Sequence, residues 1–143
     1  MQATPRAQVF SKDQVSVALR TALRILEKWQ ATTEQVCSIL SLSSSNISQI
    51  QQGKGIELDD DQLKRASIVL NCHASLRLVF ENPDNVYGFV SKDNHNEFFN
   101  GRKPLEIMAQ GDLLSLFETY NRIDLLVRTA TDGGALAAEE TSG

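Results

Sequence analysis

Apolar residues recur at the three- and four-residue spacing of a helix through most of the chain, and no segment of useful length alternates apolar and polar residues as a strand would. The clearest repeats run over residues 12–29 and 63–80. Aromatic residues make up only 6% of the sequence, which favours the packing of aliphatic helices over a β-sandwich. The sequence therefore predicts an all-α fold.

Helix-start signals divide this pattern into separate helices. Thr32 precedes Gln35 by three residues, the spacing of a capping box, and predicts a second helix that ends near Leu40. A row of serines then opens a third helix, which Gly53 and Gly55 end. Further helices are expected over 59–81, 82–90, 104–110 and 112–128. The last of these is expected to bury one face, made of Leu113, Leu116, Phe117, Tyr120, Ile123 and Val127.

Charge is distributed unevenly along the 143 residues. Residues 1–58 hold six Lys or Arg against four Asp or Glu, a net charge of +2, whereas residues 59–143 hold eight against fourteen, a net charge of −6. This asymmetry favours two regions with two roles. We expect an N-terminal helical region at 1–58, continuous with a C-terminal helical domain at 59–128, and a small, polar, disordered tail at 129–143.

Residue types that carry catalysis or bind metals are scarce. The two cysteines, Cys37 and Cys72, each lie in an apolar helical pattern and are expected to be small packing residues. The histidines, His73 and His95, are not spaced as metal ligands, and the sequence has no glycine-rich phosphate loop. We therefore expect no catalytic residue, no metal and no cofactor.

The sequence also limits where the protein works. No apolar run is long enough to cross a membrane, and the first residues do not resemble a secretion signal. We expect a cytoplasmic protein without a membrane partner. Neither half of the chain is basic enough to make a strong, nonspecific nucleic-acid binder.

Residues 32–53 have the layout of a helix-turn-helix, with the small Cys37 where the two short helices would touch. Ser41 stands at a turn position often filled by Gly, where a left-handed backbone costs about 1 kcal/mol. Asn46 and Gln49 are the expected readers of bases, because their amides can pair with adenine. The full face presented to DNA is expected to comprise Ser44, Ser45, Asn46, Ser48, Gln49 and Lys54.

Two readings of this unit stay open. The second helix holds no Arg or Lys, so one copy should bind DNA weakly and dimerisation would be needed. The alternative is a three-helix packing unit with no ligand.

A second feature spans residues 95–126, where a loop with two adjacent aromatics, Phe98 and Phe99, leads through a glycine turn into a helix that starts at Pro104. At least one of the two rings must pack inward. The segment either completes the core or forms a protein-binding surface, because exposed aromatics beside Arg are typical interface anchors.

The motif residues in this segment resemble those of the C-terminal domain of the Xre/MbcA/ParS antitoxin family. They are Asn96, Phe99, Gly101 and Pro104-Leu105-Glu106-Ile107, followed by Gly111-Asp112. Together with the preceding helix-turn-helix, the resemblance covers roughly residues 10–128. It implies an all-helical antitoxin encoded beside its toxin, usually a RES-domain protein that consumes NAD. The C-terminal part would block the toxin's active-site cleft, and the helix-turn-helix would repress the operon.

On this resemblance we expect the chain to assemble with its cognate toxin and to bind operator DNA. A homodimer is expected because a helix-turn-helix reads two half-sites with two copies. The toxin-facing residues are expected on the loop and on the exposed side of the last helix: Asn100, Arg102, Lys103, Tyr120, Arg122, Asp124 and Arg128. A stand-alone helix-turn-helix repressor, with residues 59–128 as its dimerisation domain, is the main alternative. A structural adaptor for another helical partner is the third.

Overall fold

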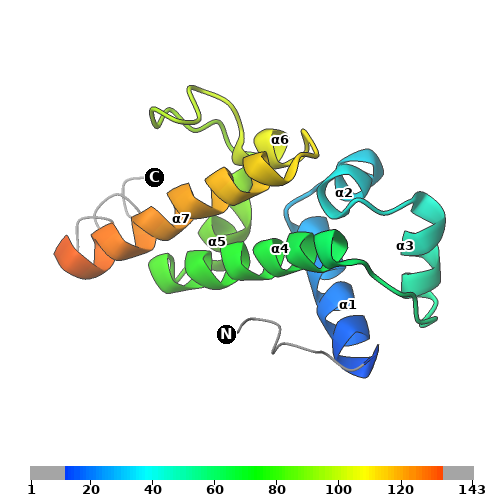
Figure 1. Ribbon diagram of the computed structural model, residues 1–143. Coiled ribbons are helices and arrows are strands. Elements are labelled where there is room, and N and C mark those ends of the chain that lie inside the picture. The colour runs from blue at the N-terminus through cyan, green and yellow to red at the C-terminus, as the bar shows by residue number, and fades with distance from the viewer. Residues whose placement is uncertain (1–11, 134–143) are drawn as a thin grey trace, which may run out of the picture.

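The computed structural model describes residues 12–133, and within them every regular element is helical (Figure 1). The elements are α1 (Lys12–Lys28), α2 (Thr33–Leu40), α3 (Ser44–Gln51), α4 (Asp60–Val79), α5 (Pro83–Gly88), the 3-10 turn η2 (Phe89–Ser91), α6 (Pro104–Met108) and α7 (Leu113–Gly133). The predicted all-α fold is confirmed.

Local capping chemistry sets where these helices begin. The side chains of Thr32, Ser43 and Asp59 each accept a hydrogen bond from the backbone N–H three residues later, and the side chain at that later position bonds back to the cap residue. Each of these capping boxes satisfies two backbone donors that the helix leaves unpaired. The predicted starts of α2, α3 and α4 are therefore confirmed.

Helix α4 lies at the centre of the molecule and packs against α1, α2, α5 and α7. The long helices α4 and α7 lie side by side, while α3 lies at the opposite end of the molecule from the C-terminal end of α7 (Figure 1). One apolar core joins these elements and includes the fully buried Trp29, Val69, Cys72, Leu116 and Ile123. Helix α4 is thus the scaffold for both halves of the chain.

Helix α7 buries most of the face that its apolar residues predicted, including Leu116 and Ile123, but not Phe117. Phe117 is 47% exposed, whereas the side chains of Ser115 and Thr119 are buried. The hydroxyl of Thr119 donates to the carbonyl of Ser115 at 2.8 Å, so this small polar group is satisfied within its own helix. These small side chains face the core beside Leu116, which turns the ring of Phe117 outward. The prediction that Phe117 is buried was wrong.

The last helix is also longer than the sequence indicated. Helix α7 continues to Gly133, beyond the predicted helix end at residue 128 and into the segment predicted as a tail. The remainder of the predicted tail, residues 134–143, lies outside the residues that the structure describes.

Candidate functional site

Helices α2 and α3 meet across a three-residue turn, at the place where the sequence predicted a helix-turn-helix. Ser41 ends α2 in the left-handed conformation, with φ 57° and ψ 47°, as its position predicted. The backbone N–H of Leu42 donates to the carbonyl of Cys37 at 3.1 Å, and the side chain of Leu42 is buried. Cys37 itself is half-buried. The turn therefore reverses the chain tightly without a glycine.

The first turns of α4 hold this unit in place. The Nε2 of Gln62 donates to the carbonyl of Ser41 at 2.8 Å. The guanidinium of Arg65 donates to the carbonyls of Ser38 and Ile39 at 3.1 and 3.3 Å, and to the carboxylate of Asp61 at 2.9 Å. Arg65 is buried, so these bonds satisfy the last carbonyls of α2 away from solvent. The angle between α2 and α3 is thus tied to the scaffold helix.

Helix α3 contains five of the six residues predicted to face DNA, and Lys54 follows its end, in two kinds of environment. Ser44, Ser45, Ser48 and Lys54 are exposed, whereas Asn46 and Gln49 are half-buried. Asn46 also has a structural role, because its Oδ1 accepts from the hydroxyl of Ser43 at 2.9 Å within the capping box. Its Oδ1 is therefore occupied, which leaves Gln49 as the less constrained amide for reading a base.

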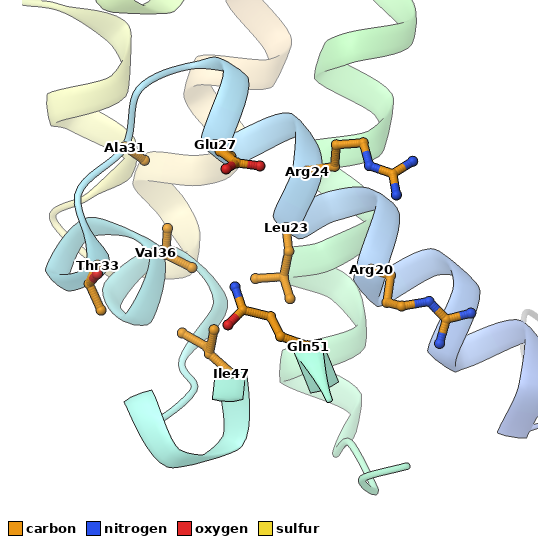
Figure 2. A pocket seen from close by; sticks show the side chains of 9 residues that line it. All are labelled: Arg20, Leu23, Arg24, Glu27, Ala31, Thr33, Val36, Ile47 and Gln51. Atoms are coloured by element: carbon orange, nitrogen blue, oxygen red, sulfur yellow. The ribbon is translucent and has the colours of Figure 1, made fainter. Parts of the chain in front are cut away.

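A hollow of about 370 Å³ lies between α1, α2 and α3 (Figure 2). Figure 2 shows Leu23, Val36 and Ile47 pointing toward one another across it, while the side chains of Arg20 and Arg24, which also line it, extend from α1 away from α3 in this view. Neither arginine makes an ion pair with another residue that the structure describes. Two unpaired guanidiniums beside α3 can neutralise phosphates, which the recognition helix itself cannot do.

Sequence reasoning missed Arg20 and Arg24 as site residues. Their four-residue spacing on the polar side of α1 was visible in the sequence, since residues four apart share one helix face. What the sequence did not contain was the packing of α1 beside α3. That contact places the two arginines on the hollow that Ile47 and Gln51 of α3 also line.

The predicted toxin-facing loop closes on itself. The backbone N–H of Gly101 donates to the carbonyl of Asn94 at 2.7 Å, and the N–H of Asn94 donates to the carbonyl of Arg102 at 3.1 Å. The reversal uses two residues with positive φ, Asn100 at 53° and Gly101 at 83°. The guanidinium of Arg102 donates to the carbonyls of Phe98 and Phe99, at 3.1 and 2.9 Å. Arg102 therefore stiffens the loop as well as lining it.

The motif residues behind the family resemblance belong to this same unit. Asn96 accepts from the N–H of Phe98 at 2.9 Å, and Phe99 is buried. Pro104 begins α6, and the carboxylate of Glu106 accepts from the N–H of Lys103 at 3.3 Å. Asp112 caps α7, because its carboxylate accepts from the N–H and the hydroxyl of Ser115 at 2.9 and 2.7 Å. Each motif residue has a structural role between the loop and α7.

The exposed side of α7 brings together three of the predicted toxin-facing residues. Arg122, Asp124 and Arg128 line a hollow of about 330 Å³. Arg128 donates to Asp124 at 2.7 Å, and the guanidinium of Arg122 lies 4.9 Å from the ring centre of Phe98 on the loop. This cation–π contact joins α7 to the loop. Asn100, Arg102 and Lys103 are exposed on the loop and before α6, whereas Tyr120 is half-buried against the core.

Three exposed apolar side chains on α7 complete this surface: Leu114, Phe117 and Leu125. Sequence reasoning placed Phe117 in the core and did not single out the other two. An exposed apolar patch of this kind is typical of a protein-interaction site.

The titratable groups in the core do not form a reactive cluster among the described residues. Burial raises the pKa of the Cys72 thiol. Burial and the nearby Arg77 lower the pKa of His73, whose ring stacks on Tyr87 at 5.3 Å. Within residues 12–133, no three His, Cys, Asp or Glu side chains are grouped as metal ligands, and no helix is long and apolar enough to span a membrane.

Comparison of the chain with protein-family models, with curated proteins and with solved structures found no match.

Proposed function

We propose that this chain is the cytoplasmic antitoxin of a type II toxin–antitoxin system. It neutralises a RES-type, NAD-consuming toxin by covering the active-site cleft, and its helix-turn-helix binds operator DNA to regulate the operon. The observation that carries the proposal is the closed loop at 94–102, which links the motif residues to α6 and α7 as one unit. A stiff loop beside an exposed apolar and charged helix face suits protein binding.

Charge supports the same assignment. Residues 59–143 carry a net charge of −6, which attracts a basic toxin at long range, whereas the four basic residues of the proposed contact face suit acidic groups beside the cleft. Long-range attraction of this kind speeds encounter and favours the correct partner, while the apolar residues of α7 supply contact area. The antitoxin needs no catalytic group for a steric block of this kind.

The helix-turn-helix supports the regulatory part of the proposal. Its turn is pinned by Gln62 and Arg65, so α3 presents a fixed polar face, and Arg20 and Arg24 add positive charge at its side. Base contacts from α3 would specify the sequence, and the arginines of α1 would contribute phosphate contacts.

Co-expression with the product of the adjacent gene tests the proposal. We expect that gene alone to arrest growth, and this chain to restore growth and to co-purify with the toxin. A harmless neighbour that forms no complex would contradict the proposal.

A matched pair of variants locates the binding face. Arg122→Glu with Arg128→Glu reverses two charges beside the hollow of α7 and should weaken toxin binding without a large change in thermal midpoint. Lys64→Glu with Arg77→Glu makes the same charge change on exposed positions of α4 and should leave toxin binding intact. Equal losses in both double variants would remove the α7 face from the interface and point to net charge instead.

The pinned turn of the helix-turn-helix specifically favours a second function, that of a stand-alone repressor. A repressor would bind DNA upstream of its own gene tightly and specifically, with no toxic neighbour. The co-expression experiment separates the two functions, because only the antitoxin restores growth.

A further inference from the structure

A small apolar hollow lies between the N-terminal parts of α1 and α4. Its volume is about 210 Å³. Its apolar lining includes Val15, Ala18 and Leu19 of α1, Leu63 and Leu70 of α4, and Leu58 of the connection between α3 and α4. Pockets that hold cofactors or drug-sized ligands are larger, roughly 300–1,000 Å³. The size and the lining therefore suit one large apolar side chain better than a separate ligand.

The sequence directly before α1 supplies such a side chain. Helix α1 begins at Lys12, and Ser11-Lys12-Asp13-Gln14 has the Ser-x-x-Gln spacing of a capping box, with Ser11 as the cap residue. Capping boxes also open α2, α3 and α4 in this chain. In a helix that starts in this way, the residue before the cap often packs against the fourth helical residue, a contact called a hydrophobic staple. Here that pair is Phe10 and Val15.

We propose that Phe10 occupies the hollow and joins α1 both to α4 and to the connection between α3 and α4. Its staple partner Val15 is half-buried and lines the hollow, which extends to Gln14 in the first turn of α1. Phe10 lies two residues before Lys12, so it remains within about 7 Å of the start of the helix. It is also the only aromatic residue in the sequence before α1.

The connection between α3 and α4 explains why this contact matters. Within the part of the chain that the structure describes, the backbone N–H groups of residues 55–58 donate no hydrogen bond. Ile56 and Leu58 are half-buried against the core, so apolar packing holds this segment. A ring in the hollow adds to that packing, because Leu58 is part of the lining. The inference goes beyond the proposed function and makes the residues before α1 part of the helix-turn-helix unit.

Nuclear Overhauser effects in the full-length protein test the contact directly. We expect cross-peaks from the ring of Phe10 to the methyl groups of Val15, Leu58 and Leu63. Leu78 is 77% exposed on α4 and should give none. A ring without cross-peaks to the three lining residues would overturn the proposal.

Urea denaturation tests the energetics. Phe10→Ala should raise the equilibrium constant of unfolding at least about tenfold, since a large buried apolar side chain is lost. Leu78→Ala is the control at an exposed position and should change that constant less than about twofold. Combining Phe10→Ala with Leu63→Ala should destabilise less than the sum of the two single changes, because the side chains contact each other. Strictly additive losses in this pair, or no loss in Phe10→Ala, would contradict the contact.

Xenon separates Phe10 from any other occupant, because a dry apolar cavity takes up this gas. We expect xenon to shift the methyl resonances of Leu63 and Leu70 in Phe10→Ala and to leave them unchanged in the wild type. Nitrogen-15 relaxation should show residues 55–58 to be more mobile in Phe10→Ala than in the wild type. Xenon uptake at this hollow in the wild type, or unchanged mobility of residues 55–58, would overturn the proposal. None of these experiments involves the toxin or DNA, so their failure would leave the proposed function unaffected.

Discussion

Two Asp–Arg pairs with the same four-residue spacing have opposite environments in this protein. On α4, Arg65 bonds to Asp61 with only 9% of its side chain exposed, whereas on α7 Arg128 bonds to Asp124 with 73% exposed. Arg65 also binds two carbonyls of α2. The same chemical pair is thus structural in the helix-turn-helix region and is available to a partner on α7.

The proposed function assigns different roles to the two regions, and this difference agrees with that assignment. Near α2 and α3, the side chains of Gln62 and Arg65 on α4 donate hydrogen bonds to the carbonyls of α2 and the turn. On α7 and the loop before α6, charged and apolar side chains extend into solvent. In the proposed function, the α2–α3 unit is held in a fixed geometry that presents α3. The exposed side chains of α7 and of the loop before α6 are available to contact a protein partner.

Replacing the buried arginine should have the largest effect on stability. Arg65→Met keeps an apolar stem but leaves the carbonyls of Ser38 and Ile39 and the carboxylate of Asp61 without their donor. We expect the free energy of unfolding to fall by about 3 kcal/mol. Urea denaturation measures this change. A loss under about 1 kcal/mol would mean that the hydrogen bonds from Arg65 to α2 contribute little to stability.

The left-handed turn residue should give the next largest effect, in the stabilising direction. Ser41→Gly removes the steric cost of the left-handed conformation and should raise the free energy of unfolding by about 1 kcal/mol. Asn100→Gly is the matching change in the C-terminal loop. Its gain should be smaller, because Asn adopts this conformation more readily than Ser. Thermal unfolding of the two variants measures both gains in stability. A larger gain from Asn100→Gly than from Ser41→Gly would contradict this account of the turn.

Breaking the exposed pair should have little effect. Arg128→Ala removes a solvent-screened ion pair and should lower the free energy of unfolding by less than about 0.5 kcal/mol. Urea denaturation under the conditions used for Arg65→Met gives a direct comparison. A loss near that of Arg65→Met would remove the contrast between the two regions.

Acid should weaken the start of α7 by a small amount. The hydrogen bond from the Ser115 hydroxyl, followed by that from its backbone N–H, lowers the pKa of Asp112. The folded state therefore binds this proton less readily than the unfolded chain. The resulting stability is present above the ordinary Asp pKa and is lost as pH falls through the lower, folded pKa. Ser115→Ala should make stability less dependent on pH in this acid range. Unfolding of both proteins measured as a function of pH tests this. The same pH dependence in Ser115→Ala and in the wild type would contradict the role of Ser115 in lowering the pKa of Asp112.

Local signals in the sequence predicted the helices well. Capping boxes involve residues three apart, so Thr32 and Asp59 could be recognised without knowledge of the fold. The left-handed turn at Ser41 followed from its place between two short helices. These features depend on chain neighbours alone.

The features that failed depend on packing between distant segments. Phe117 fitted an apolar helical pattern, but contact with the core turned the small side chains of Ser115 and Thr119 inward instead. The burial of Arg65 against α2 has no local signal in the sequence, because its partner Ser38 lies 27 residues away. Arg20 and Arg24 became site candidates only once α1 lay beside α3. Of the candidate site, the polar face of α3 was predictable, and the apolar face of α7 was not.

Measuring two affinities on the same preparations tests most directly whether the two regions bind different partners. One is for DNA from upstream of the chain's own gene, and the other is for the toxin encoded beside it. Ser45→Ala with Gln49→Ala should lower DNA affinity by at least about tenfold and leave toxin affinity unchanged. Asn100→Asp with Lys103→Glu, two changes on the loop and directly before α6, should lower toxin affinity and leave DNA affinity unchanged. If each double variant lowers both affinities equally, the two regions do not have separate roles.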